Sequence, residues 1–237
     1  NLIIKLTDNA STDRTVAIIE TFDDPRISIH RNDTYIGGEK NFDRCIELAE
    51  GKYTAIYHAD DVYESRMVEK QVAFLEANLE AGAVFTEASL INENGKMIGN
   101  IHLPSGVASI GGLYKFTDIF KAVLQHSNFL ICPSAMVRTA VYRREIQCWR
   151  WGLFKYSADL DVWLRILQRH PIGILPESLM RYRISRSQWT ARVRLQTTRA
   201  DFFLVIDHYL AQGKIRAMVS PQDLKNYSRL DRRDKVV

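Results

Sequence analysis

The sequence predicts an α/β fold, a mostly parallel sheet flanked by helices and followed by a helical C-terminal extension. The first half alternates short apolar strand-like runs with amphipathic segments of about ten residues. The chain has 237 residues, of which 46% are hydrophobic, enough to bury one large core. The alternation stops near residue 91, where a hairpin signal and a helix-rich second half begin.

The elements of the first half follow one another in βαβ order. The helix expected first has Ile18, Ile19 and Phe22 on one side, and Gly51 ends the second helix. Strands that alternate with helices in this way form a parallel sheet. We expect strands at 2–6, 26–31, 53–58 and 81–91, and helices at 13–22, 40–51 and 66–78.

The second half is less regular. "NENG" at 92–95 predicts a hairpin turn, and Pro171 ends a strongly periodic helix. From Trp189 onward the chain is amphipathic and helical, with a charged tail. We expect helices at 115–125 and 157–170, an added strand at 134–138, and short strands at 172–175 and 178–185.

Charge and cysteine content narrow the class of protein. The net charge of +4 suits an anionic substrate or surface without requiring one. Three widely spaced cysteines without a CxxC pair argue against a disulfide scaffold and for a reducing compartment. No run has the apolar length of a membrane span, and no signal peptide is visible. Because the chain starts without Met in an apolar run, we expect that an upstream segment is missing.

The stretch "YHADD" places Asp60 and Asp61 after an expected strand. Sheets of this kind bind ligands at the carboxyl ends of their strands, and Mg²⁺ or Mn²⁺ would neutralise two adjacent carboxylates. The alternative is that Asp61 caps the next helix while Asp60 is solvated. Both interpretations stay open from this stretch alone.

Two further polar loops follow expected strands. In "TDNASTD", Asp8 is placed to accept hydrogen bonds from a nucleoside, although a plain loop with good helix-capping residues explains the same pattern. In "NDTYIGG", Gly37 and Gly38 permit unusual backbone conformations or close approach of a ligand. Their spacing matches no established phosphate-binding motif.

Taken together, "TDNASTDRT", "N…GG…NF…C…LAEGKY", "HADD", "GLFKYSADLDVWLRIL" and "LMRYRIS" resemble glycosyltransferase family 2 in order and spacing. The resemblance implies an inverting enzyme with a GT-A-like, Rossmann-like fold that uses a nucleotide-sugar donor. It covers residues 1–186, and residues 187–237 form the helical extension. The family's opening strand is absent from the sequence.

The resemblance implies a role for each matching residue. Asp8 would contact the nucleotide base, usually uracil, and Asp60 and Asp61 of the DXD-type motif would hold the Mn²⁺ or Mg²⁺ that bridges the donor diphosphate. Asp159 would be the general base, although a helix N-cap is the alternative and Asp161 could share either role. Arg183 would pair with the diphosphate.

The sequence departs from the family pattern at three positions. His58 stands where an aspartate is usual, at a position that would touch the donor ribose or the metal. Ala158 replaces a glutamate before the expected base, and Ser185 replaces a histidine that would contact the diphosphate.

The remaining segments have two interpretations each. The aromatic residues Trp149, Trp151, Phe154 and Tyr156 would either stack on a sugar or fill the core. The arginine-rich segment 181–199 would be a solvated face with one diphosphate ligand, or a patch for anionic lipid head groups and peripheral membrane contact. We expect the apolar face of the next helix, at 200–210, to pack on the domain.

The function expected from the resemblance is a metal-dependent hexosyltransferase. It would move a sugar from a nucleoside diphosphate, UDP above all, to a glycan or lipid-linked acceptor. This would occur in the cytoplasm, at the inner face of the membrane, in synthesis of cell-surface polysaccharide or glycolipid, without a nucleic-acid partner. The alternatives are a nucleotidyltransferase and a non-catalytic nucleotide- or sugar-binding module.

Overall fold

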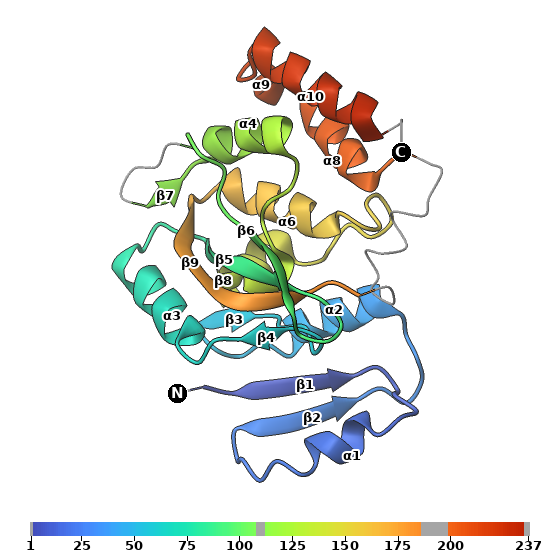
Figure 1. The fold of residues 1–237 in the computed structure, drawn as a ribbon. Helices are drawn as coiled ribbons and strands as arrows, with labels where there is room; N and C mark the ends of the chain where they lie inside the picture. Colours follow the sequence, from blue (N-terminus) through green and yellow to red (C-terminus); the bar gives the residue numbers. More distant parts are fainter. Residues whose placement is uncertain (1, 108–111, 186–198, 235–237) are drawn as a thin grey trace.

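The structure is a computed structural model that describes residues 2–107, 112–185 and 199–234 (Figure 1). Its strands are β1 (Ile4–Asp8), β2 (Ile27–Arg31), β3 (Tyr53–Ala55), β4 (Val62–Tyr63), β5 (Ala83–Ile91), β6 (Met97–Ile101), β7 (Leu113–Tyr114), β8 (Met136–Arg138) and β9 (Ile172–Arg183). Its longer α-helices are α2 (Gly38–Glu47), α3 (Met67–Ala77), α4 (Phe116–His126), α6 (Ala158–Leu167), α8 (Asp201–Leu210) and α10 (Pro221–Asp234). The shorter helices are α1 (Thr15–Ile19), α5 (Thr139–Val141), α9 (Gly213–Arg216), the 3₁₀ turn η1 (Cys132–Ser134) and the π-helical turn η2 (Tyr142–Ile146).

The first βαβ unit forms a sheet of its own. β1 and β2 pair in parallel, from Ile4 opposite Ile27 to Asp8 opposite Arg31, and α1 connects them (Figure 1). α1 does not bury the apolar residues that were expected on one side of it. The helix ends at Ile19, and the side chains of Ile18 and Phe22 lie exposed.

The other seven strands form one mixed sheet in the order β3-β8-β5-β9-β4, with β6 beside β5 and β7 beside β9. The two longest strands, β5 and β9, pair in parallel. The shorter strands pair antiparallel, including the predicted hairpin of β5 and β6 and the predicted added strand β8. The two short strands expected at 172–175 and 178–185 are one strand, β9, whose register against β5 shifts on either side of Glu87.

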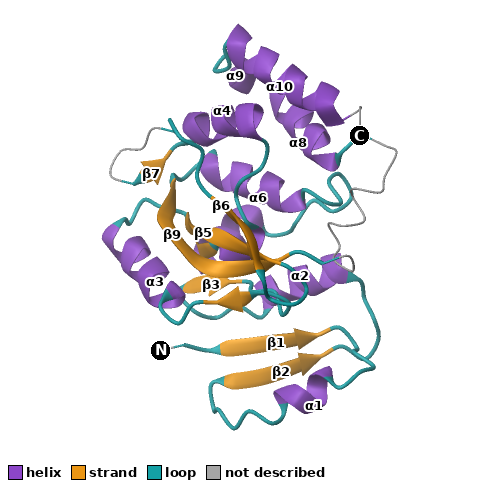
Figure 2. Cartoon of the chain, in the orientation of Figure 1, coloured by secondary structure: helices purple, strands orange, loops and turns teal. Residues whose placement is uncertain are grey.

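Helices cover both faces of this sheet, as an α/β fold requires (Figure 2). Successive side chains of a strand point to opposite faces. Accordingly, Ala83 and Phe85 of β5 join the core under α4 and α6, whereas Val84 between them packs with Leu75 of α3. The predicted α/β fold class with a central sheet flanked by helices is confirmed.

The C-terminal helices pack on this core. Phe203, Val205, Ile206 and Tyr209 of α8 are buried in the same cluster as α4 and α6, as expected for this helix. Arg199 donates hydrogen bonds to Asp207, Asp231 and Tyr227, and so ties the start of α8 to α10. None of the helices in the described part of the chain combines the length and the apolarity that crossing a membrane takes.

Candidate functional site

Three side chains from "YHADD" meet in the loop between β3 and β4. One ligand atom each from His58, Asp60 and Asp61 lies within 4.8 Å of the others, and we call them the His–Asp–Asp cluster. Nδ1 of His58 lies 4.0 Å from Oδ2 of Asp61, whose side chain is fully buried. The strand expected at 53–58 ends at Ala55, so the paired aspartates lie further along the loop than the sequence predicted, in one cluster with His58.

Neighbouring groups hold the loop in this shape. The Tyr63 hydroxyl accepts a hydrogen bond from the His58 backbone N–H at 2.6 Å and donates one to the His58 carbonyl at 3.1 Å. The Tyr63 ring stacks on Tyr57 with centroids 4.3 Å apart. Arg183 of β9 makes two hydrogen bonds to the same turn. Its backbone N–H donates to Asp61 Oδ1 at 2.8 Å, and its side-chain Nε–H donates to the Asp60 carbonyl at 2.7 Å. Sequence analysis missed Tyr63 because a tyrosine on a two-residue strand carries no motif signal.

Burial shifts the protonation equilibria of the cluster. Desolvation raises the pKa of Asp61 to about 6, against the hydrogen bond from Arg183, and the charge of Asp60 adds to the increase. Desolvation lowers the pKa of His58 although the charge of Asp60 opposes it. The neutral imidazole and the buried carboxylate thus offer lone pairs to a cation at neutral pH.

Two buried atoms of the cluster lack hydrogen-bond partners among the described residues, which suits the binding of a divalent cation. His58 Nε2 and Asp61 Oδ2 are buried, and neither has a hydrogen-bond partner among the described residues. Buried polar atoms normally find a partner, because leaving one without costs free energy. A cation bound by His58, Asp60 and Asp61 would provide such partners.

Asp159 lies at the start of α6, where the helix dipole favours negative charge. Its Oδ1 accepts a hydrogen bond from the Leu160 N–H at 2.8 Å, and desolvation raises its pKa to about 6. Asp161, two residues later, is fully buried and lies 3.0 Å from the Arg165 guanidinium, while its Oδ1 accepts a hydrogen bond from Tyr209 at 2.9 Å. Asp161 therefore joins α6 to α8, and Asp159 is the carboxylate available to chemistry.

A cavity of about 420 Å³ is lined by Asp159 and by one member of the cluster, His58. Cys132 from η1 also lines it. Desolvation and the nearby charges of Asp159 and Asp61 raise the pKa of the Cys132 thiol well above its ordinary value. The thiol thus stays protonated at neutral pH.

Aromatic side chains form much of the cavity wall. Trp149 and Trp151 stack with centroids 4.9 Å apart, and Trp151 Nε1–H donates to Asp43 Oδ2 at 3.1 Å. Tyr156 also lines the cavity, whereas Phe154 is buried against His208. Of the four aromatic residues predicted to stack on a sugar or fill the core, Phe154 belongs to the core and the other three border the cavity.

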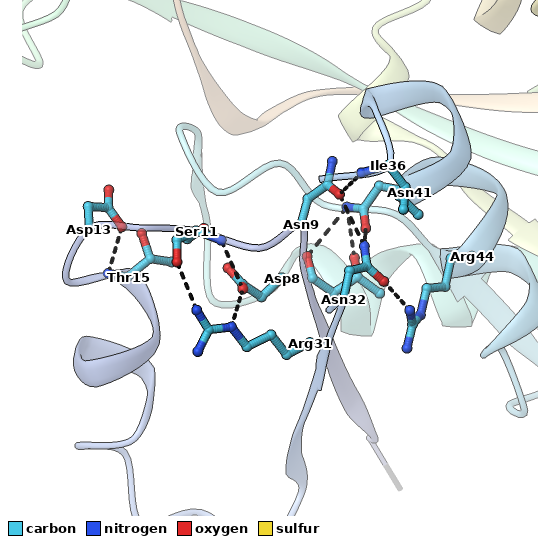
Figure 3. A network of polar contacts seen from close by, with 11 residues as sticks. Asp8, Asn9, Ser11, Asp13, Thr15, Arg31, Asn32, Ile36, Asn41 and Arg44 are labelled. Carbon is cyan, nitrogen blue, oxygen red and sulfur yellow. Dashed lines mark hydrogen bonds and ion pairs between the residues drawn. The ribbon is translucent and has the colours of Figure 1, made fainter. Parts of the chain in front are cut away.

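Asp8 lies at the end of β1, in the separate two-stranded sheet. Figure 3 shows its carboxylate between Ser11 and Arg31: Oδ2 accepts a hydrogen bond from the Ser11 N–H at 3.1 Å and lies 3.4 Å from Arg31 Nε. Asp13 accepts a hydrogen bond from the Thr15 N–H at 2.9 Å, but the N-cap residue of α1 is Arg14, which makes no side-chain capping hydrogen bond. Asp8 belongs neither to the His–Asp–Asp cluster nor to the cavity lining as described.

A network of asparagines holds the glycine-containing loop near Asp8. Asn9 Oδ1 accepts hydrogen bonds from Asn32 Nδ2 and from the Ile36 N–H (Figure 3). Asn9 Nδ2 donates to the Gly37 carbonyl. Gly37 has a positive φ of 87°, a conformation that side-chain-bearing residues rarely adopt. The predicted need for glycine in this loop is therefore met at Gly37.

The described part of the arginine-rich segment is paired within the protein. Arg181 donates a hydrogen bond to Glu64. Arg183 Nη1 donates to the carbonyls of Asn92 and Glu93, while other atoms of Arg183 bind the Asp60–Asp61 turn. Arg199 pairs with Asp207 and Asp231. The rest of the proposed membrane patch, 186–198, lies outside the described residues.

Comparison with known proteins was made by sequence and by structure. Residues 2–146 match the family described as Glycosyl transferase family 2. An uncharacterised glycosyltransferase of Methanocaldococcus jannaschii is 27% identical over 199 residues, which cover 80% of this chain and 62% of the relative. An uncharacterised glycosyltransferase of Haemophilus influenzae is 27% identical over 201 residues, covering 79% of this chain and 58% of the relative.

Solved structures of S. aureus TarS have a similar fold. TarS 1–349 in complex with UDP-GlcNAc superposes with a TM-score of 0.67 over 95% of this chain and 62% of TarS, at 15% identity. The complex with UDP gives a TM-score of 0.63 over 95% of this chain and 61% of TarS, at 16% identity. At this identity the likeness shows the fold alone, and the chain spans less than two thirds of each protein compared.

Proposed function

Because the chain belongs to glycosyltransferase family 2, we propose that it transfers a sugar, with inversion, from a nucleoside diphosphate to an acceptor hydroxyl. The observation that carries the proposal is that Asp159 and His58 of the His–Asp–Asp cluster line one cavity. In this proposal Asp159 is the base and the cluster is the diphosphate site of the same cavity. The structures of TarS with UDP and UDP-GlcNAc support a UDP-sugar as donor.

Asp159 is the proposed general base. A sugar hydroxyl is a weak nucleophile until its proton is removed, and a carboxylate within hydrogen-bond reach removes it during attack. A pKa of about 6 leaves Asp159 ionised at neutral pH and makes it a stronger base than an exposed carboxylate. Attack from the side opposite the leaving group inverts the anomeric carbon.

The donor diphosphate is proposed to lie against the His–Asp–Asp cluster. When bound there by His58, Asp60 and Asp61, Mn²⁺ or Mg²⁺ would offset the charge that grows on the leaving group. Arg183 adds positive charge beside this turn, while its hydrogen bond to the Asp60 carbonyl keeps the turn in place. Its proposed role is therefore positioning as well as charge balance.

Asp8 is proposed to contact the nucleotide base. The hydrogen bond from Ser11 and the ion pair with Arg31 fix the direction of its carboxylate. A glycan or lipid-linked acceptor, a membrane-side cytoplasmic location and a role in cell-surface synthesis remain proposals that rest on the family resemblance. The family match speaks against the nucleotidyltransferase alternative.

The test is UDP release from UDP-GlcNAc in the presence of Mn²⁺, with and without candidate sugar acceptors. Asp159→Asn keeps the hydrogen bond from Leu160 but removes the base, so kcat should fall about 10²- to 10⁴-fold while UDP affinity is unchanged. Asp23→Asn, an exposed aspartate beyond α1, is the matched control and should retain activity. Equal turnover by wild type and Asp159→Asn would remove Asp159 from the mechanism, and UDP binding without turnover of any nucleotide sugar would favour a non-catalytic binding module.

A further inference from the structure

The His–Asp–Asp cluster combines a nitrogen donor with two oxygen donors. Imidazole binds the later first-row ions Co²⁺, Ni²⁺ and Zn²⁺ well, whereas Mg²⁺ prefers oxygen ligands and gives up its water reluctantly. A site of three carboxylates follows the same affinity order but discriminates less steeply between these classes of ion. His58 therefore gives this chain a means of choosing among cations.

The imidazole is held beside the two carboxylates. Tyr63 fixes the His58 backbone through both its N–H and its carbonyl, and the Phe42 ring packs edge-on against the imidazole with centroids 5.4 Å apart. Such support reduces the entropy that the side chain loses when it binds an ion. His58 is thus set up as a ligand rather than as a mobile surface side chain.

The buried atoms of the cluster also lack protein partners. The Arg183 backbone N–H donates a hydrogen bond to Asp61 Oδ1. The other carboxylate oxygen, Oδ2, therefore faces His58. Oδ2 and His58 Nε2 are buried and have no partner among the described residues. A cation that accepts both nitrogen and oxygen would bind Oδ2 together with an imidazole nitrogen, of which Nδ1 faces Oδ2 at 4.0 Å, whereas a purely oxygen-seeking ion would leave the imidazole unused.

We propose that His58 makes the cluster selective for transition-metal ions, so that Co²⁺, Ni²⁺ and Zn²⁺ bind more tightly than Mn²⁺, and Mn²⁺ more tightly than Mg²⁺. This order follows the general affinity order of nitrogen-containing sites. The inference rests on the proposed cation site of the transferase. The rival role for His58 is a hydrogen bond to the donor ribose, which would leave the choice of ion unaffected.

The experiment measures ion binding directly, without turnover. Binding of Mn²⁺ is followed by the loss of the free-ion electron paramagnetic resonance signal, and Co²⁺, Ni²⁺, Zn²⁺ and Mg²⁺ compete for the site, each with and without UDP. The variants are His58→Asp, which makes the ligand set all oxygen, and His58→Gln, a second variant in case the added charge unfolds the loop. His126→Gln, at an exposed histidine in the last turn of α4, is the matched control.

We expect the preference of the wild-type chain for Co²⁺ over Mg²⁺ to fall by at least about tenfold in His58→Asp and in His58→Gln, and to persist in His126→Gln. An unchanged preference in both His58 variants would overturn the inference. If the variants lose UDP affinity with the ion order intact, His58 is a ribose ligand while the proposed transferase stands. If wild type binds no ion even with UDP, the inference fails, and UDP release without added metal then decides whether the proposed function survives.

Discussion

At the scale of single residues, two buried carboxyls dominate the electrostatics of the site. Asp61 and Asp159 each have a pKa of about 6, above the ordinary 3.8, and desolvation is the largest cause in both. Their burial favours the neutral acids, so the ionised forms that the proposed chemistry needs are held at some cost in stability. Placing them near one cavity is typical of a functional site.

These shifts predict how the stability of the metal-free protein depends on pH. Between about pH 4 and pH 6 these two carboxyls bind more protons in the folded state than in the unfolded state, because their pKa is higher in the folded state. Their contribution to stability is therefore full below about pH 4 and is lost as the pH rises through about 6. The free energy of unfolding, measured in urea at steps of pH, should decline across this window.

The variant Asp159→Asn tests whether Asp159 causes part of this decline in the free energy of unfolding. The variant removes one of the two groups, so its stability should fall less steeply with pH than that of wild type or of Asp23→Asn. Superimposable slopes for all three proteins would show that Asp159 titrates normally.

Most single-residue roles in the site were not predictable, since they depend on contacts between distant parts of the chain. Asp43 accepts a hydrogen bond from the indole of Trp151, which lies 108 residues away in the sequence. Asp61 accepts one from Arg183, which lies 122 residues away. The sequence motif did predict the proximity of Asp60 and Asp61, because neighbours in a loop stay close whatever the fold. The family resemblance pointed to Asp159 as the base, but the sequence did not predict that Asp161 is buried against Arg165 and Tyr209.

At the scale of elements, periodicity predicted the long helices and strands well. α3 and α6 lie within the expected ranges, α4 extends one residue beyond its range, and the hairpin follows from "NENG". Periodicity failed where tertiary contacts decide: two short strands were expected at 172–175 and 178–185, yet β9 runs through Pro176, since β5 pairs with β9 on both sides of it. α1 is shorter than the helix expected at 13–22, because no other part of the described chain covers its apolar side.

The contact between β9 and α3 depends on a glycine. A Cβ atom at Gly173 would lie 2.1 Å from the ring of Phe74, far inside van der Waals contact. Gly173→Ala must therefore displace Phe74 or the strand, and we expect a loss of about 1–3 kcal/mol in the free energy of unfolding in urea. The control is Gly99→Ala in β6, where the nearest atom would be 3.6 Å from the new Cβ and little should change. Equal stabilities for the two variants would mean that Phe74 does not pack as described.

At the scale of the whole molecule, three parts of the described chain meet around the proposed site. The loop after β3 supplies the His–Asp–Asp cluster, β9 holds that loop, and α6 presents Asp159 from a helix packed under α8. The C-terminal helices thus belong to the same core as the base. The sequence indicated this packing through the apolar face of α8, although it could not tell which surface that face would cover.

The central claim is that the His–Asp–Asp cluster is a metal-dependent site for a nucleoside diphosphate. The most direct measurement is calorimetric binding of UDP with and without Mn²⁺, to wild type and to Asp60→Asn/Asp61→Asn, which retains hydrogen-bonding oxygens but loses both charges. Glu20→Gln/Asp23→Asn removes two exposed charges near α1 and is the matched control. We predict that Mn²⁺ tightens UDP binding at least about tenfold, or about 1.4 kcal/mol, in wild type and control but not in Asp60→Asn/Asp61→Asn. UDP binding that is equally tight with and without Mn²⁺, or a metal effect that survives the loss of both aspartates, would contradict the account.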